Sequence, residues 1–121
     1  MSNLKKILTD YGADYEVIME RFMENEEMCL NFLDQMFEDD DIKKMRHVFC
    51  SQDTESIAKA AHTLKGIIGT MGLTPLYNAI CKVLDALRAG KSQEHCLELY
   101  KDVQKEFEKA DALHIRLKEE A

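Results

Sequence analysis

The sequence has little that would indicate a β fold, a membrane span or a rigid loop framework. It contains one proline, five glycines and no tryptophan among 121 residues. Alternating Val, Ile and Thr patterns typical of strands are absent, and helix-forming residues dominate. No apolar run approaches the ~20 residues that cross a bilayer. We therefore expect an all-α fold in one domain.

Cysteine pairs and targeting signals are also missing. The first ten residues lack the uninterrupted apolar stretch of a secretory signal, so we expect a cytoplasmic location. The cysteines form no C-x-x-C pair, and each lies within or beside an apolar helical stripe: Cys29, Cys50, Cys81 and Cys96. We interpret them as reduced, buried, small hydrophobic residues.

A basic face is not indicated either. The net charge is -7, with 23 acidic against 16 basic residues. General nucleic-acid binding favours clustered Lys and Arg, and so does docking on anionic membranes. The acidic run 38–41 lacks the alternating ligands and central glycine of an EF-hand, so we interpret it as a solvated interruption of a helix.

Capping signals divide the chain into helices. Start signals are Asn25, Asp53 or Thr54, Thr74 followed by Pro75, and Ser92. Stop signals are Gly12, Gly72 and Gly90. We expect one or two short helices within about residues 3–23 and four substantial helices within about 25–118, the first of them interrupted or bent at 38–41.

Each substantial helix has one apolar stripe, and the connections are short. Short connections make neighbouring helices antiparallel, and four stripes can satisfy one another. We predict a monomeric, up-down antiparallel four-helix bundle, with the short N-terminal helices covering one end. Residues 1–121 would form this single domain.

The stretch 60–72 organises the chain because its predicted helix has two different faces. Its core stripe consists of Ile57, Ala61, Leu64, Ile68 and Met71. A neighbouring arc consists of Ala58, His62, Lys65, Gly66 and Gly69. Each interior glycine costs about 1 kcal/mol relative to Ala. Two of them beside a histidine indicate a surface kept bare for close approach.

This arc has the parts of a phosphohistidine site. A neutral imidazole nitrogen can attack phosphorus, and an exposed histidine is largely neutral at pH 7. Lys65 lies one helical turn from His62, so its ammonium can offset phosphoryl charge. Gly66 leaves room for phosphoryl oxygens and for a partner's active site.

The segment Ala61-His62-Thr63-Leu64-Lys65-Gly66, followed by Gly69 and Leu73, resembles the signature of histidine-containing phosphotransfer (HPt) domains. The upstream segment 21–27 resembles the entry to that family's first long helix, and the resemblance extends from about Tyr15 to the last helix. It departs from the family at Ile67 and Ile68, where small residues are common, and at Thr70, which replaces a frequent Asn.

The resemblance implies a role for each matching residue. His62 would be the phosphoacceptor, Lys65 would stabilise the phosphoryl group and Gly66 would provide clearance. The partner would be a response-regulator receiver domain or a hybrid sensor kinase, and the receiver would supply Mg²⁺. Lys59 and Gly69 are candidate docking residues, and we expect Ile67 to influence the choice of partner. The chain itself would carry no cofactor and no metal.

Two other classes of function stay open. One is a helical adaptor that docks on a receiver or kinase without being phosphorylated. The other is a structural or metal-binding bundle, for which His47 and Cys50 share a helical face. We expect His95 and His114 to be solvated. No glycine-rich nucleotide loop is present, so we predict a phosphocarrier rather than a kinase.

Overall fold

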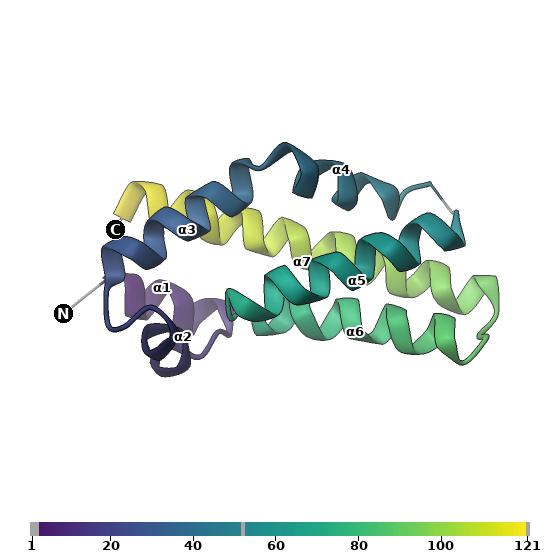
Figure 1. Cartoon of the computed structure of the whole chain (residues 1–121), viewed down its shortest axis with the longest axis horizontal. Helices are drawn as coiled ribbons and strands as arrows, with labels where there is room; N and C mark the ends of the chain where they lie inside the picture. The colour runs from purple at the N-terminus through teal and green to yellow at the C-terminus, as the bar shows by residue number, and fades with distance from the viewer. Residues whose placement is uncertain (1–2, 52, 121) are drawn as a thin grey trace.

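The computed structural model describes residues 3–51 and 53–120, and this part of the chain contains seven helices and no strand. The all-α prediction is therefore confirmed (Figure 1). The helices are α1 Asn3–Tyr11, α2 Tyr15–Arg21, α3 Glu26–Glu38, α4 Asp40–Val48, α5 Thr54–Thr70, α6 Thr74–Arg88 and α7 Gln93–Glu120. Among these residues, no helix is long and apolar enough to cross a membrane.

The long helices run side by side along the molecule (Figure 1). Helix α6 packs between α5 and α7, α4 packs on α5, and α3 packs on α7. The short helices α1 and α2 lie at one end, where α1 contacts α7 and α2 contacts both α1 and α3. The core joins all seven helices, and its fully buried side chains include Leu8, Ile18, Leu33, Ile57, Leu64, Ile80 and Val83.

The predicted interruption at 38–41 is a clean break between two helices. Asp39 ends α3, and its side-chain oxygen accepts a hydrogen bond from the backbone N–H of Ile42, three residues on. A carboxylate in this position satisfies a free N–H of the next helix and complements the helix dipole. The acidic run therefore starts α4 as well as ending α3.

Most predicted caps are confirmed. The Asn25 side chain accepts from the N–H of Met28, and the Ser92 hydroxyl accepts from the N–H of His95. One prediction was wrong: Leu73, not Thr74, is the N-cap of α6. The Thr74 hydroxyl instead donates to the carbonyl of Gly72 at 3.4 Å. Thr74 has entered the helix because Pro75 adopts a helical backbone without needing an N–H partner.

Gly72 follows α5 with a φ of 75°, the left-handed conformation expected after a helix end. A Cβ at this position would also collide with the side chain of Ile18 on α2. The glycine therefore allows a sharp turn and the close approach of α2 to the end of α5.

The predicted burial of the cysteines was wrong in part. All four are free, but Cys81 is only half-buried and Cys50 is exposed. The Cys50 sulfur accepts a hydrogen bond from Nε2 of Gln104 at 2.8 Å. Phe32, on the apolar stripe of α3, is 49% exposed and packs its ring against Phe22 with centroids 5.6 Å apart. Cys50 lies just past the end of α4, whereas Phe32 lies in the middle of α3, and no neighbouring helix covers either side chain completely.

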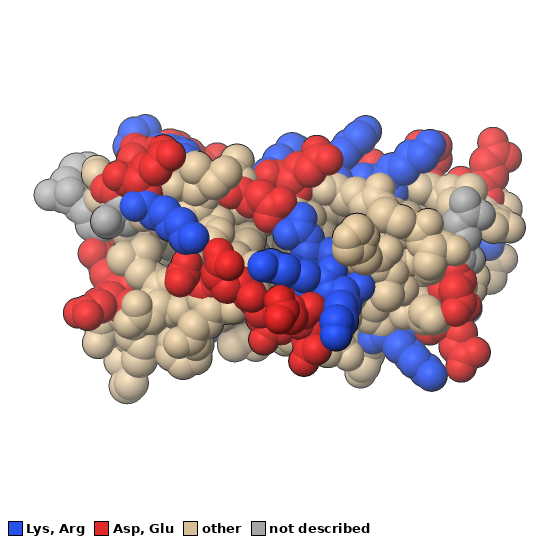
Figure 2. Space-filling model, turned by 90° about the horizontal axis from the view of Figure 1, so that it is seen from above, with Lys and Arg blue, Asp and Glu red and all other residues tan. Residues whose placement is uncertain are grey.

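The face seen in Figure 2 carries acidic and basic side chains close together. Charges of opposite sign also pair between helices. Arg46 donates from Nη1 to Oδ1 of Asp111 at 2.9 Å and from Nη2 to Oδ2 at 2.8 Å. The Arg46 guanidinium also lies 4.4 Å from the ring centre of Phe107. These contacts attach α4 to α7 and hold one side of α5 in place.

Candidate functional site

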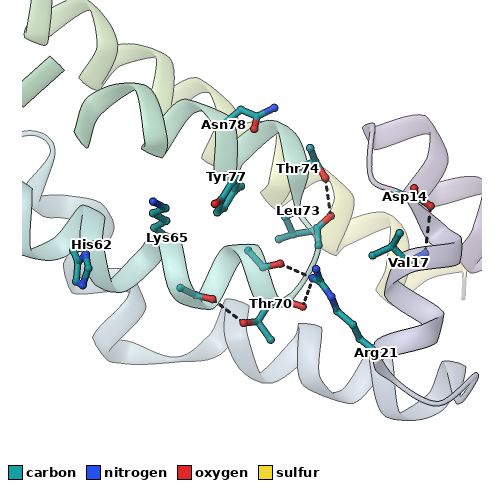
Figure 3. Close-up of a pocket in the computed structure, with 13 residues that line it drawn as sticks. Asp14, Val17, Arg21, His62, Lys65, Thr70, Leu73, Thr74, Tyr77 and Asn78 are labelled. Carbon is teal, nitrogen blue, oxygen red and sulfur yellow. Dashed lines mark hydrogen bonds between the residues drawn. The ribbon is translucent and has the colours of Figure 1, made fainter. Parts of the chain in front are cut away.

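A surface groove of about 870 Å³ runs beside α5 and is walled by α6 and by the α2 region (Figure 3). Helix α5 contributes His62, Lys65, Gly66, Gly69 and Thr70. The α2 side contributes Asp14, Val17 and Arg21. The structure thus places His62, Lys65, Gly66 and Gly69, chosen from sequence spacing, along one groove.

His62 is exposed near the middle of α5. Its neighbours on the core side of the helix, Ala61 and Leu64, are fully buried, so α5 is held firmly while the imidazole faces solvent. Within the described residues, no hydrogen bond or ion pair to the His62 ring is found. Both ring nitrogens are therefore available to an incoming group.

Lys65 is half-buried in the same groove. In Figure 3 its side chain extends toward α6 rather than toward His62. No carboxylate in the described part of the chain pairs with its ammonium. Because a lysine side chain turns about four carbon–carbon bonds, the ammonium can move toward a charge placed on His62.

The two interior glycines of α5 serve different purposes. A Cβ on Gly66 would meet no atom within 4 Å, so the fold itself does not require a glycine there. A Cβ on Gly69 would lie 2.9 Å from Cε1 and 3.0 Å from Cδ1 of Tyr77. The bare surface at Gly66 is open to a partner, whereas the space at Gly69 is filled by the protein's own aromatic ring.

Arg21 connects α2 to the end of α5. Its Nη1 donates to the carbonyl of Gly69 at 2.6 Å and to that of Thr70 at 3.0 Å. A cation at the C-terminal end of a helix is favourable because the helix dipole is negative there. Arg21 therefore helps to position the wall of the groove and adds a second positive charge to its lining.

The remaining residues singled out from the sequence lie elsewhere. Lys59 is outside the groove lining, and its ammonium lies 3.4 Å from the exposed carboxylate of Glu55. Ile67 is half-buried and packs against the core rather than lining the groove. Thr70 does line it, and its hydroxyl donates to the carbonyl of Gly66 at 2.8 Å.

The prediction that His114 is solvated was wrong. Its side chain is 12% exposed, stacks on Phe37 with ring centres 4.5 Å apart, and lies 2.9 Å from Oδ1 of Asp34. With Glu38, these groups place three potential metal ligands within 4.8 Å of one another. Lys118 Nζ lies 3.2 Å from a Glu38 oxygen and 3.8 Å from Asp34, so a cation of the chain already offsets both carboxylates.

Arg21 and Tyr77 are groove residues that sequence reasoning did not single out. Arg21 is 48 residues from Gly69 in the chain, and no local pattern indicates that the two meet. Tyr77 had a weak signal: it lies between the core positions Leu76 and Ile80, on the side of α6 next to its stripe. Only the packing of α5 on α6 shows which residue it covers.

Comparison with known families gives one match. Residues 17–113 match the model of the family described as Hpt domain. The matched range includes every residue that lines the groove except Asp14. No curated protein and no solved structure matches the chain.

Proposed function

The chain belongs to the Hpt domain family, the phosphocarrier modules of two-component phosphorelays, and on this basis we propose that His62 is its phosphoacceptor. The observation that supports this assignment most directly is the exposed, unpartnered His62 ring in a groove with Lys65 and Gly66. The other exposed histidines are His47 on α4 and His95 in the first turn of α7, and neither lines this groove.

The reaction transfers a phosphoryl group between an aspartate of a receiver domain and His62. One imidazole nitrogen uses its lone pair to form the N–P bond, and the P–O bond to the aspartate breaks, releasing a carboxylate. In the reverse direction the carboxylate attacks and the imidazole leaves. The receiver supplies Mg²⁺ and most of the catalytic groups.

Lys65 stabilises the phosphoryl group once it is on His62. A phosphoryl group carries close to two negative charges, and Lys65 has no competing carboxylate partner in the described residues. At ~4 Å the attraction is on the order of a few kcal/mol with an effective dielectric of about 20, and less where water and salt screen it. The side chain reaches this position by turning from α6 toward His62.

Gly66 provides clearance for the receiver. The open space around its Cα lets the receiver's active site approach α5 more closely than any side chain at this position would allow. Lys59 remains a proposed peripheral contact outside the groove, and Gly69 takes part through the ring that covers it. In this proposal the long helices form an up-down four-helix bundle. Helices α3 and α4 together make up its first helix, and α5, α6 and α7 are the other three. The bundle presents His62 to a cytoplasmic receiver.

Phosphotransfer from a receiver tests the proposal. A receiver charged with acetyl phosphate should place an acid-labile, base-stable phosphoryl group on the wild-type chain and on a His95→Gln control. His62→Gln should accept none. Labelling of His62→Gln at the wild-type rate would overturn the proposal. Receiver binding and full pathway output by His62→Ala would favour the unphosphorylated adaptor instead.

A further inference from the structure

Tyr77 divides the groove into an open part and a closed part. Its ring lies against the backbone of α5 at Gly69, where an added Cβ would come within 2.9 Å of it. One turn earlier on α5, Gly66 has open space on the same side of the helix. The space beside α5 is therefore open at Gly66 and filled by the Tyr77 ring at Gly69.

The ring of Tyr77 rests on the backbone of α5. Its Cδ1 and Cε1 lie against Gly69. The side chain of Cys81, one turn along α6, raises the pKa of Tyr77 above its ordinary value. In Figure 3 the hydroxyl end points toward Lys65. A ring fixed in this way loses little freedom when a partner packs on it.

The exposed part of this ring continues the proposed phosphotransfer site. Tyr77 is half-buried, and Val17 on the α2 side of the same groove is 39% exposed. Leu73, between the ends of α5 and α6, is fully buried beneath this part of the groove. The cations Lys65 and Arg21 flank this apolar part of the groove. Toward its α2 end the groove thus offers the apolar side chains of Tyr77 and Val17, with Lys65, Arg21 and Asp14 also in its lining.

We infer that Tyr77 is a specificity-determining residue, which selects receiver domains that present an apolar side chain to the groove. This inference rests on the proposed function of His62. A receiver with a bulky side chain opposite Tyr77 would collide with the ring. A receiver with a charged side chain there would lose the hydration of that charge without gaining a hydrogen-bond or ion-pair partner. Receivers with a compact apolar residue would gain contact with a preformed aromatic surface.

Transfer kinetics with several phosphorylated receivers, compared between variants, test the inference. Tyr77→Ala should raise KM for the preferred receiver about tenfold and leave kcat at saturation nearly unchanged. The ratio of kcat/KM between the preferred receiver and the next one should shrink by a similar factor. Tyr77→Phe keeps the ring and should keep the preference. Phe32→Ala, which removes an exposed aromatic ring outside the groove, is the matched control.

A double variant separates docking from folding. Tyr77→Ala with Gly69→Ala places a methyl group in the space that the ring leaves, so its melting temperature should exceed that of Tyr77→Ala alone. Its receiver preference should nevertheless stay reduced. Recovery of the preference together with stability, or an equal loss of kcat/KM toward every receiver, would overturn the inference and leave Tyr77 as a packing residue.

Failure of the inference differs from failure of the proposed function. If receivers label His62 but the Tyr77 variants show an unchanged profile, only the inference is overturned. If no receiver labels the wild-type chain, the affinity of the same receivers for His62→Gln and for His62→Gln with Tyr77→Ala decides the role of Tyr77. A loss of affinity in the second protein would support the docking role without phosphotransfer, and equal affinities or no binding would overturn it.

Discussion

The guanidinium of Arg21 donates to the carbonyl of Gly69 at 2.6 Å and to that of Thr70 at 3.0 Å. The carbonyls in the last turn of a helix lack intrahelical partners. The Gly69 carbonyl also accepts a hydrogen bond from the N–H of Gly72. One exposed side chain on α2 therefore completes the end of α5, the helix that carries His62. The short N-terminal helices thereby help to position the site.

Replacing Arg21 should loosen this end of α5. We expect Arg21→Ala to lower the free energy of unfolding by about 1 kcal/mol, since it removes a charged donor from two carbonyls at a helix end. Urea denaturation measures the change. Arg88→Ala, at an exposed position in the last turn of α6, serves as the comparison. An equal loss in both variants would show that the bonds of Arg21 contribute nothing beyond its charge.

Gly66→Ala should make the protein more stable and less active. Alanine favours a helix by about 1 kcal/mol over glycine, and the new methyl group meets no atom within 4 Å. Thermal unfolding should shift upward, while transfer from the receiver slows because the methyl group occupies the clearance space. Gly69→Ala should do the opposite to stability, since its methyl group displaces the ring of Tyr77. If Gly66→Ala accepts phosphate from the receiver at the wild-type rate, Gly66 is not needed to give the receiver clearance.

Lys65→Gln should slow phosphotransfer about tenfold, because the Lys65 ammonium stabilises the charge of the phosphoryl group. The stability of the protein should not change, since this ammonium has no carboxylate partner within the described chain. Rapid-quench kinetics measure the rate, and the decay of isolated phosphoprotein measures the lifetime of the phosphohistidine. Lys59→Gln removes the same charge from α5 outside the groove. If both variants slow transfer equally, the effect comes from the total positive charge on α5 and not from the position of Lys65 in the groove.

Acid should weaken the contact between α3 and α7 at Asp34. The hydrogen bond from His114 lowers the pKa of Asp34 below its ordinary value of 3.8. A lowered pKa in the folded state means that the ionised carboxylate favours folding above about pH 4, and that this contribution disappears as pH falls through the folded value. The difference in unfolding free energy between wild type and Asp34→Asn should shrink over that window.

Urea denaturation at a series of pH values between 7 and 3 checks this expectation. Glu119→Gln, an exposed position near the end of α7, provides a control for the general effect of removing a carboxylate. A difference between wild type and Asp34→Asn that stays constant down to pH 3 would contradict the role of the ionised carboxylate.

Local chemistry made much of the architecture predictable. Helix starts at Asn25 and Ser92 and the stop at Gly72 follow from single side chains that satisfy, or release, nearby backbone groups. The error at Thr74 shows the limit of this reasoning. Whether a residue caps a helix or joins its first turn depends on a shift of one residue, and two adjacent residues offered starting chemistry.

The sequence alone determined the helical class and the shared face of His62, Lys65 and Gly66, because three- and four-residue spacings place side chains together on any helix. The tertiary structure decided what surrounds that face. It alone shows that Tyr77 fills the space at Gly69, that Arg21 reaches the end of α5 and that His114 is largely buried beside Asp34. Such contacts join residues distant in the chain, and they form only when helices pack at particular registers.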